Sequence, residues 1–137
     1  MPTVKVLSAG AVKSMVEAIG PEFERASGNT LDVIFATAFA QRERIVNGAA
    51  ADLVIVSESI VADLEKLGLV VPGSARNLGR TVTGVIVPDG SAVPDISTVE
   101  AFKRALLNAR SVAYTDPKAG GSGGIMFAAL LEKLGIA

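Results

Sequence analysis

Before Val71, strand-like runs alternate three times with runs of helical periodicity. The strand-like runs are Val4–Ala9, Thr30–Phe35 and Asp52–Val56. Because parallel neighbours in a sheet need a crossover connection, usually a helix, this alternation favours parallel pairing over hairpins. We therefore predict an α/β fold with a mostly parallel sheet and helices on both faces. The unbroken apolar centre of the third run is typical of a strand covered on both faces.

Helical periodicity follows each of the three runs. In the first helix, Gly20–Pro21 predicts a kink or a tightened turn, and Gly28 marks the end. A second helix is predicted over Ala38–Val46. A third begins after Ser57, whose hydroxyl can cap the first turn, and stops at Gly68.

The pattern changes after the turn-forming Val71–Ser74. The elements expected beyond it are a strand over Thr81–Val87, a helix capped by Ser97, a strand over Val112–Thr115 and a helix over Ile125–Leu134. We place a boundary near residue 80, between a first lobe over 1–80 and a partial second lobe over 81–137. Two strands and two helices are few for an independent domain, so we expect the complete fold to need more chain or a second copy.

The absent residue types exclude whole classes of chemistry. Without histidine there is no Ser-His-Asp triad, no histidine-ligated zinc and no histidine general base; without cysteine there is no disulfide or thiolate site. Thirteen basic against fourteen acidic residues, with no basic cluster, argue against a nucleic-acid partner. No apolar run is long enough for membrane insertion. A metal could use oxygen ligands only, and we predict neither a metal nor a cofactor.

Three junctions of small residues mark the candidate site. They are Ser8–Ala11 after the first strand, Ala36–Phe39 after the second, and Thr115–Gly124 before the last helix. In an open parallel sheet, ligands bind beyond the carboxyl ends of the strands, where helix N-termini direct free N–H groups. The Gly-Gly-Ser-Gly-Gly run can cradle an anion with its amides and the Ser122 hydroxyl, although such runs are more often plain loops. Arg42 is either an anion contact or an ordinary surface cation.

Four side chains are candidate acids or bases for an enzyme, namely Asp52, Glu58, Asp116 and Tyr114. Asp52 begins a strand, at the end of the sheet away from the expected site, which favours a structural role. Glu58 follows the third strand at the correct edge, but its place also suits an acid in the first turn of a helix. The four form no catalytic signature, and we predict no catalytic residue.

The order of short motifs along nearly the whole chain resembles one family. The matching segments are Val6–Val12, Pro21–Gly28, Phe35–Ala38, Gly48–Ile55, Leu64–Ser74 and Thr115–Ile136. In this order they are similar to the type II periplasmic solute-binding proteins, in the branch that resembles the molybdate-binding proteins of ABC importers. The joint order is far more specific than any one motif.

The resemblance implies two α/β lobes joined by a hinge, with an anion held in the cleft by N–H groups and hydroxyls at helix N-termini. The resemblance places ligand contacts at Gly10, Ala11, Thr37, Ala38, Gly121, Ser122 and Gly123. The residues themselves add Ser8 at the end of the first strand and Arg42 one turn into the second helix. Where molybdate binders use serine hydroxyls in the first two loops, this chain has Ala11 and Thr37–Ala38. The loss of hydroxyls suits a larger carboxylate better than a tetrahedral oxyanion.

Three hypotheses for function follow. The leading one is a solute-binding protein that closes its lobes on a small anion and serves an ABC transporter permease. The alternatives are an isomerase, since some relatives of this branch isomerise aconitate, and a vestigial ligand-sensing domain. A second copy of the chain could complete the unfinished lobe. The family is periplasmic, but Met1–Thr3 leads into a strand without a secretory leader, so a cytoplasmic location stays open.

Overall fold

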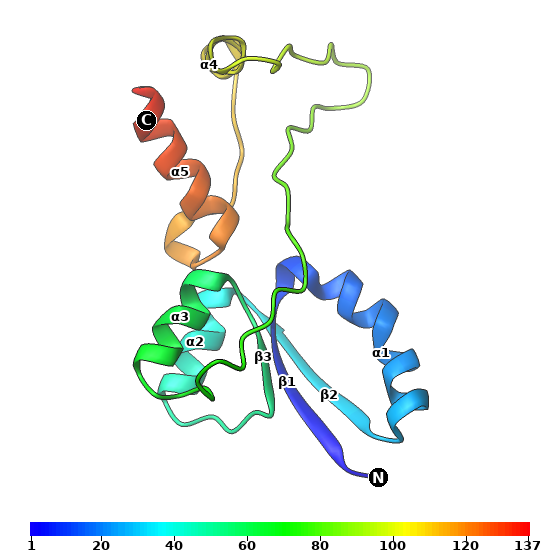
Figure 1. Ribbon diagram of the computed structural model, residues 1–137. Helices are drawn as coiled ribbons and strands as arrows, with labels where there is room; N and C mark the ends of the chain where they lie inside the picture. The colour runs from blue at the N-terminus through cyan, green and yellow to red at the C-terminus, as the bar shows by residue number, and fades with distance from the viewer.

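The first half of the chain forms a three-stranded parallel sheet in the computed structural model, which describes residues 1–137 (Figure 1). Its strands are β1 (Thr3–Ala9), β2 (Thr30–Ala36) and β3 (Leu53–Ile55), in the order β2-β1-β3. β1 pairs with β2 along its whole length and with β3 over three residues. The α/β class and the parallel sheet predicted from the alternation are confirmed.

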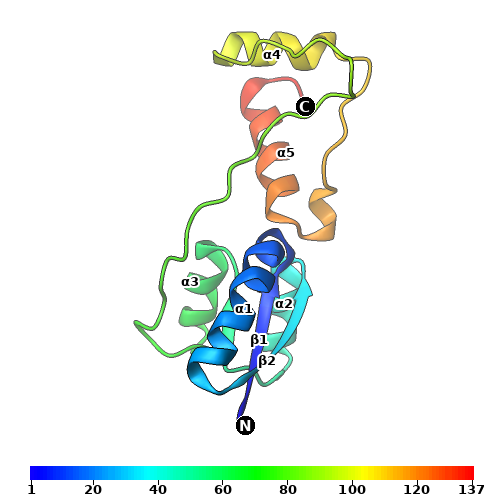
Figure 2. The ribbon, with the colours of Figure 1, turned by 90° about the vertical axis from the view of Figure 1, so that its right-hand side faces the viewer.

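Helices cover both faces of this sheet, as the crossover connections require. A 3-10 turn, η1 (Gly10–Val12), leads into α1 (Lys13–Ser27), and the later crossover helices are α2 (Ala38–Val46) and α3 (Glu58–Lys66). α1 lies on one side of the sheet, whereas α2 and α3 lie together on the other side (Figure 1 and Figure 2). The N-termini of α1 and α2 are therefore directed toward the carboxyl edge of the strands.

One local prediction for this half is corrected, at β3, whereas the predicted end of α1 at Gly28, whose φ is 70°, is confirmed. α1 runs through Pro21 as one helical element, and a kink there stays a prediction. Gly20 is buried, and a Cβ at this position would already lie 3.5 Å from Leu31, so the helix stays close to β2 at the expected kink. β3 is an edge strand in which Leu53 is 49% exposed, so it is not covered on both faces. It pairs with β1 alone, and no helix covers Leu53.

The core lies between the sheet and the α2–α3 pair. Leu7 of β1, Ile45 of α2 and Leu64 of α3 form a buried cluster. Partly buried apolar side chains pack against this cluster, namely Val54, Ile60 and Val70. Leu64 has no exposed surface at all, so it is the most completely buried side chain of this cluster.

The second half is helical and carries no sheet. Its elements are α4 (Val99–Asn108), the 3-10 turn η2 (Pro117–Ala119) and α5 (Ser122–Leu134). The strands predicted over 81–87 and 112–115 do not form, because no neighbouring strand accepts their backbone groups. The chain instead runs as an extended segment from the sheet layer to α4, and α5 lies between α4 and the sheet layer (Figure 1 and Figure 2).

The helix starts also differ in detail from the expectations. Ser57 occupies the N-cap of α3, but its hydroxyl pairs with the Ser59 hydroxyl at 3.2 Å rather than with a backbone N–H. At α4 the cap is Thr98, whose Oγ1 accepts from the Ala101 N–H at 3.1 Å. Ser97 instead donates its N–H and its hydroxyl to Asp95. α5 begins three residues before the predicted start, so it takes in the end of the glycine run.

Candidate functional site

The first two predicted loops meet at the carboxyl edge of the sheet. β1 ends at Ala9 and passes directly into η1, and β2 ends at Ala36 beside it. A Cβ built on Gly10 would lie 3.7 Å from the Ala36 carbonyl oxygen, so the loops are in ordinary contact distance of each other. Parallel pairing over the full length of β1 explains this, because it brings both carboxyl ends to one edge.

Thr37 and Ala38 start α2 at this edge. Thr37 is the N-cap residue, and its Oγ1 accepts from the Ala40 N–H at 3.2 Å. A capping hydroxyl that accepts in this way keeps its own O–H free to donate. Ala38 is buried, whereas Gly10 and Ala11 are exposed. The two loops therefore present one hydroxyl donor, backbone N–H groups and little side-chain bulk.

The third loop reaches the same place from the second half. Gly120 is buried against Phe39 in the first turn of α2, and a Cβ at Gly120 would lie 2.5 Å from the Phe39 Cβ. Its φ of 75° also lies in the left-handed region that favours glycine. Close approach and backbone conformation thus both require glycine here. The start of α5 lies next to α2 (Figure 1 and Figure 2).

Several glycines of the run are needed for close packing, so the run is not simply an open loop that could surround an anion. A Cβ on Gly121 would lie 3.0 Å from the Thr115 side chain, and one on Gly124 would collide with the Thr115 carbonyl oxygen. Ser122, Gly123 and Gly124 form the first turn of α5, and the Gly121 N-cap supplies no side-chain acceptor. The first N–H groups of α5 are therefore uncapped, and the exposed Ser122 hydroxyl lies among them.

Two helix N-termini consequently converge on one point. α2 begins at Ala38 and α5 begins at Ser122, and Phe39 in the first turn of α2 contacts Gly120, which directly precedes the N-cap residue of α5. Each N-terminus carries a partial positive charge of roughly half an elementary charge and unpaired N–H donors. An anion placed between them would be stabilised by both.

Arg42 is committed to a different contact. Its Nε donates to Asp63 of α3 at 2.5 Å, and its NH1 donates to Glu43 at 2.6 Å. The hydrogen bonds to Asp63 and Glu43 raise the pKa of the Arg42 guanidinium above its ordinary value. The arrangement ties α2 to α3, and an anion contact through Arg42 stays a prediction that requires displacing these carboxylates.

A residue that the sequence analysis missed connects the two strand ends. Gln41 has no exposed surface, and its Nε2 donates to the Ser8 carbonyl at 2.9 Å and to the Ile34 carbonyl at 2.6 Å. Its Oε1 is buried without a hydrogen-bond partner. Gln41 thus holds β1, β2 and the first turn of α2 together beneath the loops. The available signal was spacing, because Gln41 and Ile45 share the core face of α2 at i and i+4.

Ser8 lies in the same buried layer. It is completely buried in β1, and its hydroxyl donates to the neighbouring Ala9 carbonyl at 3.2 Å. A ligand approaching from solvent meets Gly10 and Ala11 before it can meet this side chain. We therefore no longer expect the Ser8 hydroxyl to contact the ligand. Ser8 instead contributes its main-chain carbonyl, which accepts the hydrogen bond from Gln41.

The four candidate acids and bases have identifiable structural environments. The Asp52 carboxylate accepts from the Lys5 N–H at 2.8 Å, and Glu58 lies in the first turn of α3. Asp116 caps η2 by accepting from the Lys118 N–H at 2.8 Å. The Tyr114 ring packs edge-on against Phe127 at 4.8 Å between centroids. No group of three acidic side chains gathers where it could hold a metal ion.

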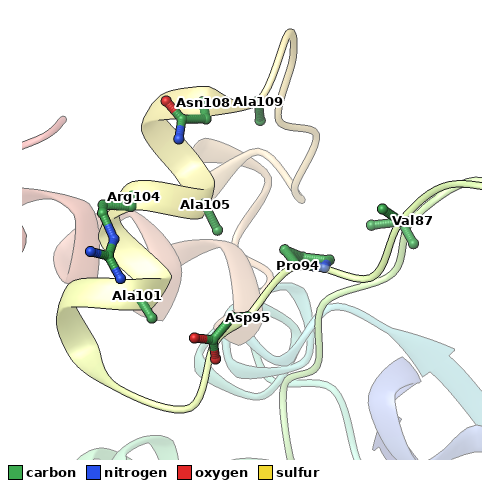
Figure 3. A pocket seen from close by; sticks show the side chains of 9 residues that line it. Val87, Pro94, Asp95, Ala101, Arg104, Ala105, Asn108 and Ala109 are labelled. Atoms are coloured by element: carbon green, nitrogen blue, oxygen red, sulfur yellow. The ribbon is translucent and has the colours of Figure 1, made fainter.

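Two hollows lie away from the three loops. A groove of about 430 Å³ lies between α4 and the extended chain before it, with Val87, Pro94, Asp95 and Arg104 around it (Figure 3). A second hollow of about 290 Å³ lies between α1 and β2. Neither is lined by a predicted ligand contact.

Comparison with known proteins places the chain among binding proteins. The profile of a family described as bacterial extracellular solute-binding protein matches residues 4–137. An aconitate isomerase from Pseudomonas sp. is 34% identical over 123 residues, which cover 86% of this chain and 47% of that protein. The chain therefore spans about half the length of this relative.

Among solved structures, similarity is found to the substrate-binding domain of a putative molybdenum ABC transporter from Clostridium difficile. The TM-score is 0.46 and the identity 16%, over 49% of this chain and 30% of the other. The helices of the present chain include none that combines the length and apolar character of a membrane span.

Proposed function

The chain belongs to the bacterial extracellular solute-binding proteins, and from this premise we propose that it binds a small anion where α2 and α5 begin. The main support for the proposal is the contact between Phe39 and Gly120, which brings the N-termini of α2 and α5 close together. The N-terminus of α2 is capped by the Thr37 hydroxyl, and that of α5 has no side-chain cap. Helix N-termini bind anions through backbone N–H groups without needing a basic surface. A net charge of −1 is compatible with that mode of binding.

The proposed contacts are the N–H groups and hydroxyls of the three loops. Thr37 retains a free O–H, Ser122 is exposed among the first N–H groups of α5, and Gly10 and Ala11 leave room above β1. The other proposed contacts are Ala38, Gly121 and Gly123, which would offer backbone groups. Arg42 stays outside this set while Asp63 and Glu43 occupy its donors.

The proposed ligand class is a di- or tricarboxylate rather than a tetrahedral oxyanion. Among the proposed contacts, Thr37 and Ser122 are the two that carry a hydroxyl, and Ala11 offers a methyl group. An organic anion can use the N–H groups for its carboxylate while its carbon skeleton fills the space that small residues leave. A bare oxyanion would lack donors on much of its surface.

Thermal unfolding with defined anions tests the proposal. Citrate, trans-aconitate and tricarballylate should raise the unfolding midpoint, since a ligand at a hundredfold excess over Kd stabilises by about 2.7 kcal/mol. Molybdate and tungstate should have little effect. Strong stabilisation by the two metal oxyanions alone would overturn the carboxylate assignment.

Matched variants locate the site. Thr37→Val and Ser122→Ala each remove one hydroxyl donor and should weaken carboxylate binding by about fivefold to tenfold. The control is Thr30→Val, which removes an exposed hydroxyl at the opposite end of β2. An unchanged affinity in both site variants would place the ligand elsewhere.

An aconitate isomerase is the second candidate function, because the 34% identical relative carries that name. A proton shift within a tricarboxylate needs a base at the ligand, and Asp116 and Tyr114 lie nearest to the glycine loop in sequence. Ultraviolet absorbance distinguishes the two functions: turnover of trans-aconitate supports the isomerase, and stabilisation without turnover supports the binding protein. No response to any anion would favour the vestigial sensing domain.

The remaining parts of the proposal concern the whole protein. We propose a hinge between lobes over 1–80 and 81–137, closure of the lobes on the ligand, and delivery to an ABC transporter permease in the periplasm. Family membership supports these points. We further propose that a second copy of the chain covers surface that the second half leaves open.

A further inference from the structure

The chain contains one Asn-Gly pair, Asn47–Gly48, directly after α2. Asparagine is chemically labile, because the main-chain nitrogen of the next residue can attack its side-chain amide carbon. A side chain on that next residue hinders the attack, whereas glycine has none. The three other asparagines are each followed by a residue with a Cβ, in the pairs Asn29–Thr30, Asn77–Leu78 and Asn108–Ala109. Residue type therefore singles out Asn47.

The pair lies on the surface, in the turn that ends α2. Asn47 is the C-cap residue of this helix, and both residues are exposed. Gly48 has a φ of 87°, and a Cβ built on it would meet nothing within 4 Å. The Asn47 side chain is therefore open to water, and no side chain shields the Gly48 nitrogen that follows it.

Main-chain hydrogen bonds restrain the attacking nitrogen while the turn is closed. The Gly48 N–H donates to the Ile45 carbonyl at 3.0 Å, and the Ala49 N–H donates to the Arg44 carbonyl at 2.9 Å. Because the Gly48 nitrogen is engaged with Ile45, its attack on the Asn47 side chain requires the turn to open. Helix ends open at a much lower free energy than a packed core does. The reaction therefore needs local opening of the last turn of α2 but no unfolding of the core.

We propose that Asn47 is a site of spontaneous deamidation whose rate is set by opening of the last turn of α2. This inference goes beyond the proposed function and does not depend on the ligand. In the first step the Gly48 nitrogen bonds to the Asn47 Cγ, the Cγ–Nδ2 bond breaks, and ammonia leaves with the proton of the Gly48 nitrogen. In the second step water adds to one of the two carbonyl carbons of the succinimide ring, and the bond from that carbon to nitrogen breaks. Opening at Cγ gives aspartate, and opening at the main-chain carbonyl gives isoaspartate.

Both products change the C-terminus of α2. Each adds a carboxylate beside the negative end of the helix dipole, which is unfavourable. Isoaspartate also adds a methylene group to the main chain, which displaces the Gly48 and Ala49 N–H groups from the Ile45 and Arg44 carbonyls. Ile45 belongs to the buried core cluster of the first half. The modified chain should therefore unfold at a lower urea concentration than the unmodified chain.

Peptide mapping by mass spectrometry, after incubation of the whole chain in mildly alkaline buffer, tests the proposal. The peptide that contains Asn47 should gain about 1 Da as ammonia is exchanged for water. This gain should be about tenfold faster than in the peptides that contain the other asparagines, because glycine follows Asn47 alone. In a parallel incubation in urea, where the turn is open, modification at Asn47 should be several-fold faster still. Fragmentation that distinguishes aspartate from isoaspartate identifies both products.

The matched variant is Asn47→Gln, whose cyclisation needs a larger ring that forms more slowly, so its peptide should stay unmodified. The control is Asn77→Gln, which removes another exposed asparagine and should leave the rate at Asn47 unchanged. Equal rates at Asn47 and the other asparagines would overturn the site, and equal rates with and without urea would overturn control by the turn. Both comparisons use the wild-type chain, so they stand even where a variant misfolds. Neither bears on anion binding, which the thermal measurements test separately.

Discussion

The two halves of the chain use similar elements but reach different degrees of packing. Before residue 71, three helices lie on a parallel sheet, and all but one of the buried apolar residues are found there. After residue 71, α4 and α5 have no sheet beneath them, and Ala101 is the single buried apolar residue. The difference shows that an amphipathic helix contributes a core only where another layer receives its apolar face.

The exposed side chains of the second half make the same point. Val99 and Leu107 of α4 are 64% and 62% exposed, and Ile125 and Met126 of α5 are about half exposed. In the first half, Leu7 and Leu64 are 4% and 0% exposed because β1 and α3 face each other across the core. Substitutions on the two sides of this boundary should therefore have very unequal effects.

The largest effect is expected at the centre of the first half. Leu64→Ala should lower the free energy of unfolding by about 2–5 kcal/mol, because it leaves a cavity in a closely packed cluster. Leu107→Ala removes the same side-chain volume from an exposed position of α4 and should cost less than about 0.5 kcal/mol. Urea unfolding at one fixed protein concentration measures both. Equal losses would mean that the second half is packed as tightly as the first.

The next effect concerns the hydrogen bonds beneath the candidate site. Gln41→Leu keeps the volume of the side chain but leaves the Ser8 and Ile34 carbonyls without their donor, at a cost of about 1–3 kcal/mol. It should also increase amide hydrogen exchange at Gly10–Val12 and at the start of α2 more than Leu64→Ala does. If the two variants raise exchange at the same places, Gln41 has no local role in holding the loops.

A smaller effect is expected where the halves touch. Gly120→Ala forces a side chain into left-handed backbone, which costs about 1–2 kcal/mol locally, and drives its Cβ against Phe39. The first half should keep its urea midpoint, whereas carboxylate binding should weaken because α5 moves away from α2. Gly73→Ala is the control, since it has a φ of 71° and nothing within 4 Å of its added Cβ. Equal carboxylate affinity in the two variants would mean that binding does not depend on the contact between Gly120 and Phe39.

The smallest effect is a change of titration in the exposed chain before α4. Hydrogen bonds from the Ser97 hydroxyl and N–H lower the pKa of Asp95 below its ordinary value of 3.8. Because the folded-state pKa is lowered, this contribution to stability is present above about pH 4 and is lost as the pH falls through the folded-state pKa. Ser97→Ala should move the Asp95 pKa upward in a carbon-detected NMR titration and leave the first half unchanged. A constant Asp95 pKa would show that the Ser97 hydroxyl does not contribute.

Periodicity predicted the first half because each of its elements has a partner in the same stretch of sequence. The runs containing Val6 and Val33 pair in register, and the helix expected over Ala38–Val46 has those bounds. The failures lie where one element depends on another that is remote. Thr81–Val87 has strand-forming side chains but finds no neighbouring strand, so its intrinsic preference is not realised.

The candidate site was predicted in part for the same reason. Loop positions follow from strand ends, so the Gly10–Ala11 and Thr37–Ala38 junctions are adjacent as expected from a parallel sheet. Arg42 faces Asp63 because of how α2 packs on α3, and Gln41 reaches two strands at once. Spacing within α2 places Gln41 on the apolar face as a visible anomaly, but it does not identify the partners of Gln41 or Arg42, which lie on other elements.

Local periodicity and the residue inventory are enough to predict the element order of the first half, its parallel sheet and the excluded chemistry, because they do not depend on distant contacts. The tertiary fold sets which elements acquire a core, the close packing at the glycines 120 and 124, and the approach of two helix N-termini to each other. Those outcomes depend on distances between residues that are far apart in the chain. The proposed site therefore depends both on the residues of the loops and on the contact between Phe39 and Gly120.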